Sequence, residues 1–112
     1  MADLQVTSEQ VDGTLVVRLT GEPNINAVAP MRELVVTTAK SGPQKVVIDL
    51  SGLEYVSSLV AGRLVELQTY LKREGGRAVI AGPNALVKDA PTRMRVPTLI
   101  PNFDTVEQAM AH

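Results

Sequence analysis

Residues 46–67 read VVIDLSGLEYVSSLVAGRLVEL, and this stretch decides the fold. Its first part continues a short apolar run from Lys45 to Leu50 that is rich in β-branched residues, which predicts a buried strand. A nearly continuous apolar strand is typical of a parallel sheet covered by helices on both faces. After Asp-Leu-Ser-Gly, predicted to be a tight loop, the apolar residues recur at helical spacing. The predicted buried stripe of this helix is Val60, Ala61, Leu64, Leu67 and Leu71.

The segments on either side predict the remaining elements of one α/β domain that spans residues 1–112. Asp12-Gly13 is a typical two-residue hairpin turn between alternating segments, and Pro30 places the start of the next helix near residues 26–30. The expected order is ββαβαβαβα, a mixed central sheet of about five strands with about four helices. The later predicted elements are a strand at 77–82, a short helix at 85–90, an edge strand near 98–100 and a helix at 106–111, capped by Asp104 or Thr105.

Composition restricts the classes of partner. The chain has 112 residues with 11 Lys and Arg against 12 Asp and Glu, so it carries no general attraction to nucleic acid, and protein partners are favoured. The absence of cysteine fits a cytoplasmic protein. The first residues lack the pattern of a signal peptide, and no apolar run approaches the roughly 18 residues of a membrane span. We therefore expect a cytoplasmic domain that does not insert into a membrane.

Catalytic chemistry has little support in the sequence. The single histidine is His112 at the end of the chain, which leaves no general base of that kind. Asp49 and Glu54 flank the predicted loop, and Asp before Ser-Gly is ordinary turn chemistry. Gly75-Gly76 and Gly82-Pro83 lack the spacing and the following Lys-Ser or Lys-Thr of a phosphate-binding loop. We expect no enzyme activity, no cofactor and no metal.

Ser57 and Ser58 stand where the central helix should begin. Neither lies in a Gly-x-Ser-x-Gly elbow, and no histidine is available to activate them as nucleophiles. Helix capping explains both residue types. A serine at a helix N-terminus is also a suitable phosphate acceptor, because the added negative charge meets the positive end of the helix dipole. Both roles remain open from the residues alone.

Several motifs together resemble one family over nearly the whole chain. They are Leu-Thr-Gly-Glu at residues 19–22, the run from Val46 to Val56, the serines at the helix start, and Gly-Gly before residues 77–80. They resemble STAS domains, in particular the single-domain anti-sigma factor antagonists of bacterial partner-switching systems. The resemblance implies a regulatory module that binds an anti-sigma factor or a related serine kinase and is switched off by phosphorylation.

The resemblance also implies the site residues. By spacing, Ser58 occupies the phosphorylated position of the family motif. Ser57 stands where an aspartate is usual, Leu59 and Val60 replace a serine and a glycine, and Asn24 stands where the family often carries aspartate. The expected partner-facing residues are Asn24, Ser57, Ser58, Leu59, Val60 and Arg63.

A second hypothesis is a constitutive accessory or scaffold subunit of a larger assembly, such as the small STAS subunit of a lipid-transport ATPase. The lost acidic residues and the apolar Leu59-Val60 pair favour this alternative.

Overall fold

The computed structural model describes residues 3–42, 44–82 and 100–112. Its sheet has five strands in the order β1-β2-β3-β4-β5, which confirms the predicted mixed sheet. β1 and β2 form the predicted antiparallel hairpin, and each later strand runs parallel to the strand before it. The strands are β1 (Gln5–Val11), β2 (Thr14–Gly21), β3 (Lys45–Leu53), β4 (Arg77–Ala81) and β5 (Asn102–Phe103).

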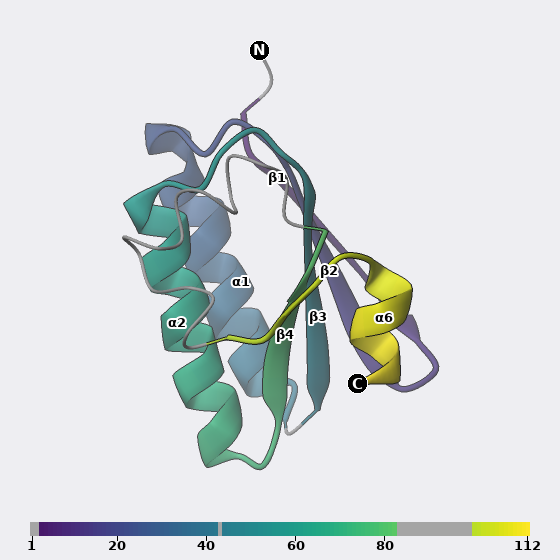
Figure 1. The fold of residues 1–112 in the computed structure, drawn as a ribbon. Coiled ribbons are helices and arrows are strands. Elements are labelled where there is room, and N and C mark those ends of the chain that lie inside the picture. Colours follow the sequence, from purple (N-terminus) through teal and green to yellow (C-terminus); the bar gives the residue numbers. More distant parts are fainter. Residues whose placement is uncertain (1–2, 43, 83–99) are drawn as a thin grey trace.

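Helices cover both faces of the sheet, as the apolar central strand predicted (Figure 1). The 3-10 helix η1 (Ile25–Ala27) leads directly into α1 (Val28–Lys40), which packs beside α2 (Ser58–Arg73) on one face. The short helix α6 (Val106–Ala111) lies on the other face. The helix predicted at residues 85–90 lies outside the described residues.

The side chains of β3 divide the interior into two clusters. Val46, Ile48 and Leu50 point toward α1 and α2, whereas Val47 belongs to a smaller cluster beneath α6. On α2, the five residues of the predicted stripe are all buried. The side chains of β3 that point toward the helices therefore pack with the buried stripe of α2 in one cluster, which holds the start of α2 in place.

The structure corrects the predicted end of β3. The strand continues through Leu53 instead of stopping at Leu50, because residues 49–52 form a bulge opposite β2 rather than a turn. Asp49 Oδ1 accepts a hydrogen bond from the Ser51 amide at 2.9 Å, and its other oxygen lies 3.7 Å from Arg18 Nε. Asp49 is thus a structural residue of the bulge, which agrees with the interpretation of this carboxylate as structural.

The last strand also differs from its predicted position near residues 98–100. Residues 98 and 99 lie outside the described residues, Ile100 is a buried bend, and the strand is Asn102–Phe103. The amides of Ile80 and Gly82 donate to the carbonyls of Pro101 and Phe103, at 2.8 and 3.0 Å. The backbone of proline can accept a hydrogen bond but cannot donate one. Residues that can both donate to β4 and accept from it therefore begin only after Pro101.

The C-terminal helix α6 has the predicted bounds and the predicted cap. Thr105 Oγ1 accepts from the Gln108 amide at 3.1 Å, and Gln108 Oε1 accepts from the Asp104 amide at 3.2 Å. Lys45 Nζ donates to the Met110 carbonyl at 2.8 Å and ties the helix to the start of β3. Desolvation, with a smaller contribution from the charge of Arg77, lowers the pKa of Lys45 below its ordinary value.

Candidate functional site

The candidate site lies where β2 and β3 end and α1 and α2 begin (Figure 1). The two strand ends are neighbours because Gly21 pairs with Leu53, and the Glu54 amide donates to the Gly21 carbonyl at 3.0 Å. The loops that follow, residues 22–24 and 54–57, therefore leave the sheet at the same edge. We call these loops, η1, the first turns of α1 and α2, and Asp3, which contacts the first loop, the helix-start pole.

The structure gives the two serines different roles. Ser57 is half-buried with extended backbone, and its Oγ accepts from the Val60 amide at 3.3 Å, so it is the N-cap of α2. Ser58 is the first residue of the helix and is exposed. Among the described residues, no hydrogen-bond partner is found for its hydroxyl. Capping thus accounts for Ser57 and leaves the Ser58 hydroxyl available to solvent.

The side chain of Asn24 caps η1 and also donates a hydrogen bond to a carboxylate. Its Oδ1 accepts from the Asn26 amide at 2.9 Å, and its Nδ2 donates to Asp3 Oδ1 at 2.8 Å. Asn26 Nδ2 donates to the other oxygen of Asp3 at 3.2 Å. The sequence shows no acid at position 24, but the fold places the carboxylate of Asp3 in direct contact with this residue.

The remaining predicted site residues, Leu59, Val60 and Arg63, are less exposed than Ser58. Leu59 is half-buried and packs against the core, and the Arg63 guanidinium pairs with Glu66 at 2.8 Å. Val60 has 0% exposure and therefore offers no surface to a partner. Its assignment as a partner-facing residue is corrected on this ground: its side chain fixes the first turn of α2 to the core.

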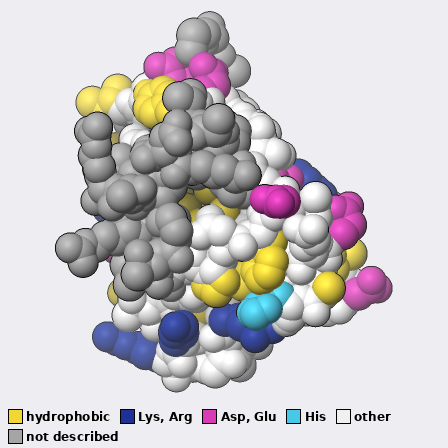
Figure 2. Space-filling model, viewed as in Figure 1, with side chains coloured by type: hydrophobic (Ala, Val, Ile, Leu, Met, Phe, Trp, Pro, Cys, Tyr) yellow, Lys and Arg dark blue, Asp and Glu magenta, His cyan; other side chains and the backbone are white. Residues whose placement is uncertain are grey.

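Sequence reasoning missed the most exposed apolar residues of the pole. Ile25 is 84% exposed, Val28 47% and Tyr55 38%. Acidic residues of the same pole are Asp3, Glu22 and Glu54. In Figure 2, hydrophobic and acidic side chains are visible at the upper end of the molecule, and a group of Lys and Arg side chains lies at the lower end. The only signal for these residues in the sequence was their apolar character at positions where a loop or the first turn of a helix faces solvent.

A family model described as the STAS domain matches residues 5–109. The chain belongs to the STAS domain family. No curated protein sequence matches it. The helix-start pole of this STAS domain carries the serines, one of the motifs on which the resemblance was based.

Solved structures with the same fold include several anti-sigma factor antagonists. The chain is 20% identical to an anti-sigma factor antagonist from Mycobacterium paratuberculosis, with 96% of this chain and 92% of that chain covered and a TM-score of 0.86. It is 21% identical to the phosphorylated form of the Bacillus cell fate determinant SpoIIAA, with coverages of 96% and 97% and a TM-score of 0.72. A substituted RsbS from Moorella thermoacetica is 21% identical, with coverages of 96% and 92% and a TM-score of 0.79.

Other kinds of site have no support in the described part of this STAS domain. Within residues 3–42, 44–82 and 100–112, no three His, Asp or Glu residues gather into a group that could hold a metal ion. No helix among the same residues is long and apolar enough to cross a membrane. His112 lies against Phe103, with 4.9 Å between ring centroids, on the α6 side of the sheet.

The two serines of this STAS domain should differ in their effect on stability. Ser57→Ala should lower the free energy of unfolding by about 1 kcal/mol, because it removes the acceptor for the Val60 amide. Ser58→Ala should change it by less than about 0.5 kcal/mol, since an exposed side chain is lost at a helical position. Urea denaturation of both variants beside the wild type measures the difference. Equal losses would contradict the assignment of the cap to Ser57 alone.

Proposed function

We propose that this STAS domain is a non-enzymatic, cytoplasmic regulator of the anti-sigma factor antagonist type, which binds an anti-sigma factor kinase through the helix-start pole. The observation that carries the proposal is the exposed hydroxyl of Ser58. This hydroxyl does not cap α2, because Ser57 is the N-cap. Similar folds in proteins named as anti-sigma factor antagonists, and in one protein solved in a phosphorylated form, support the same interpretation.

The switch that we propose is phosphorylation of Ser58 by the bound kinase. A phosphate at the first position of α2 would be stabilised by the free amides and the positive dipole at the N-terminus of the helix. The domain would therefore keep its fold. The pole already carries Asp3, Glu22 and Glu54, so the phosphate would add charge of the same sign to an acidic surface. Burying this charge against a partner would cost desolvation energy and would release the partner.

The residues of the pole define the partner surface that would fit. Ile25 and Val28 project from η1 and the start of α1, and Tyr55 projects from the loop before α2. A partner would cover these side chains and Ser58 with an apolar surface, and would meet the acids at the rim with Lys or Arg. The carboxylate of Asp3, fixed by Asn24 and Asn26, is the acidic group with the best-defined position.

Affinity capture from cells of the source organism tests the proposal. The wild type and Ser58→Ala should recover the same kinase, and Ser58→Asp should lose at least about nine-tenths of it, because a single unfavourable charge in an interface costs more than about 1.4 kcal/mol, which is a tenfold change in affinity. With ATP, the recovered kinase should add one phosphate to the wild type and none to Ser58→Ala, as read by intact mass. Equal recovery by all three proteins would show that Ser58 is not the switch.

A matched pair of surface variants tests the location of the interface. Ile25→Ser removes an exposed apolar side chain at the pole, and Val36→Ser removes another, 44% exposed, from the middle of α1. Only Ile25→Ser should reduce recovery of the kinase. Loss of recovery with Val36→Ser alone would move the interface away from the helix-start pole.

The second candidate function is a permanent subunit of a larger assembly. The exposure of Ile25, Val28 and Tyr55 favours it, since a lasting interface would cover such residues continuously. This role requires no phosphate. Two results together would favour the permanent subunit. The protein isolated from its own host would carry no phosphate under any growth condition, and it would be recovered with the same partners as the Ser58→Asp variant.

A further inference from the structure

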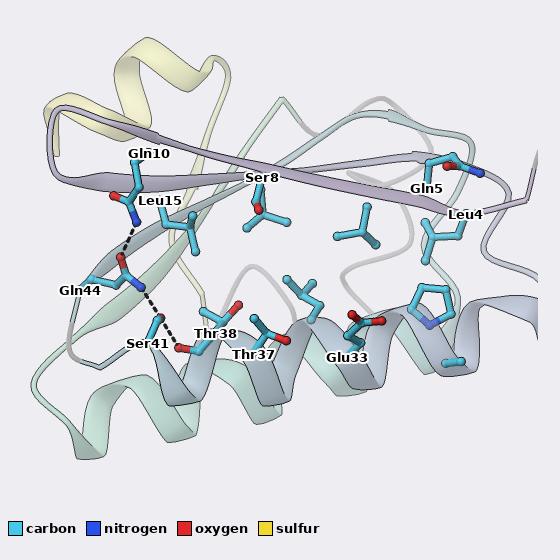
Figure 3. Close-up of a pocket in the computed structure, with 15 residues that line it drawn as sticks. Leu4, Gln5, Ser8, Gln10, Leu15, Glu33, Thr37, Thr38, Ser41 and Gln44 are labelled. Atoms are coloured by element: carbon cyan, nitrogen blue, oxygen red, sulfur yellow. Dashed lines mark hydrogen bonds between the residues drawn. The ribbon is translucent and has the colours of Figure 1, made fainter.

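A groove of about 560 Å³ lies between β1 and α1, away from the helix-start serines. Leu4, Val6, Val17, Pro30 and Leu34 are among the apolar residues that line it. Figure 3 shows Ser8 and Gln10 directed from β1 toward α1, with Glu33 and Thr37 directed from α1 toward β1. The volume is in the range of ligand-binding clefts. Most of the lining surface is apolar, although eight of the fifteen lining residues are polar or charged.

One end of the groove is closed by a chain of hydrogen bonds. Gln10 donates to Gln44 at 3.3 Å, Gln44 donates to Ser41, and Ser41 donates to the Thr38 carbonyl at 2.6 Å (Figure 3). These polar side chains are therefore already occupied by one another. The part of the groove that remains available to a ligand is the apolar stretch beside Ser8, Glu33 and Thr37.

The strand that borders this groove has a free edge. Among the described strands, β1 pairs with β2 alone. The two-residue turn makes Val11 and Thr14 a hydrogen-bonded pair, and such pairs alternate along an antiparallel ladder. The backbone amides and carbonyls of Val6, Ser8 and Gln10 consequently point away from β2. The side chains of the same three residues face the groove.

This edge carries little protection against pairing with another strand. Edge strands are commonly protected by lysine, proline or a bulge. β1 reads QVTSEQV and has one charged residue, Glu9, whose carboxylate is paired with Arg18 at 2.6 Å. An unprotected edge beside an apolar groove is the arrangement in which an extended peptide adds to a sheet and places every second side chain in the groove.

We propose that β1 and α1 form a docking site for an extended segment of a partner protein, which adds to the sheet beside β1. Every second side chain of the segment would be apolar and would enter the groove. Glu33 is the one charged residue among the groove's described lining, so a Lys or Arg on the same side of the segment would pair with it. A second copy of β1 fits less well, because it would offer Val6, Ser8 and Gln10, two of them polar, to an apolar groove.

Selection from a displayed library of random peptides on the intact protein tests the proposal. Enriched peptides should have apolar residues at every second position and a basic residue on the same side. In amide NMR spectra, a synthetic copy of the best peptide should shift and protect the amides of Val6, Ser8 and Gln10. Glu33→Lys should reverse the preference from a basic to an acidic residue in the peptide.

Two variants at one position separate the strand edge from its side chain. Ser8→Pro removes an outward amide that β2 does not use, so the fold should persist while the peptide binds at least about tenfold more weakly. Ser8→Ala keeps the amide and should bind within about twofold of the wild type. Circular dichroism confirms that both variants are folded.

Several results would overturn the proposal. One is an absence of enrichment over an unrelated immobilised protein, and another is bound peptide that leaves the β1 amides unperturbed. Equal binding by the wild type and Ser8→Pro would exclude the strand edge, and equal loss by both variants would assign binding to the hydroxyl. If sedimentation shows self-association that only Ser8→Pro abolishes, the occupant is a second copy. Each result is independent of Ser58, so failure here leaves the proposed switch intact.

Discussion

Replacing Gln68 by leucine should lower the free energy of unfolding of this STAS domain by about 3 kcal/mol. Gln68 lies on α2 with 5% of its surface exposed. Its Nε2 donates to the Ala78 carbonyl at 3.0 Å, and its Oε1 accepts from the Ala78 amide at 2.7 Å. The side chain thus completes the edge of β4 where β5 does not reach, since β5 pairs only with Ile80 and Ala81.

Leucine preserves much of the volume of Gln68 but leaves two backbone groups of Ala78 without partners. Each buried group without a partner costs about 1 to 3 kcal/mol, which sets the size of the expected loss. The midpoint of urea unfolding at constant slope measures it. Thr69→Leu, at the next and exposed position of α2, controls for the helix propensity of leucine and should stay within about 0.5 kcal/mol of the wild type. A Gln68→Leu variant as stable as this control would mean that Ala78 is satisfied in another way.

Much of the fold could be predicted because its signals are local. The apolar run of β3, the spacing of the buried stripe on α2, and the Asp12-Gly13 turn each depend on neighbours within a few residues. The Thr105 cap is equally local. The extension of β3 to Leu53 could not be predicted in this way. Asp-Leu-Ser-Gly suits a turn, and only the register against β2 makes it a bulge.

The candidate site was predictable in part. The family spacing places Ser58 at the helix start, and the structure finds it there and exposed. The contact of Asp3 with Asn24 joins residues that are 21 positions apart, and no periodic pattern encodes it. From the sequence, Val60 was assigned both to the buried stripe and to the expected partner surface. The orientation of α2 about its own axis places this side chain in the core. Long-range placement and helix rotation are thus what the sequence left undetermined.

Gly75 and Gly76 are adjacent residues after the end of α2, yet the structure implies very different costs for replacing them. Gly75 has φ of +85°, and nothing lies within 4 Å of the position that a Cβ would occupy, so Gly75→Ala should cost about 1 kcal/mol for its left-handed backbone. A Cβ on Gly76 would lie 2.5 Å from the Gln44 carbonyl oxygen and 2.7 Å from its nitrogen. Gly76→Ala should therefore cost about 3 kcal/mol.

The larger cost follows from what Gly76 touches. Backbone atoms cannot rotate away as a side chain does, so a methyl group would force the start of β4 away from the start of β3. The hydrogen bond from the Arg77 amide to the Gln44 carbonyl, at 3.1 Å, lies at this contact. The Gly76 amide also donates to the Leu71 carbonyl at 2.8 Å and closes the end of α2. Any displacement would therefore disturb both the end of α2 and the pairing of β3 with β4.

Urea unfolding of Gly75→Ala and Gly76→Ala, compared with the wild type, measures the two losses. If Gly76→Ala lost no more than Gly75→Ala, a methyl group on Gly76 would not clash with the backbone of Gln44. Since α2 ends at Arg73 and these glycines follow it, the same measurement tests how much the C-terminal end of this helix contributes to the stability of the domain. Gly76 fixes the C-terminal end of α2, whereas the buried side chain of Val60 fixes the end that presents Ser58.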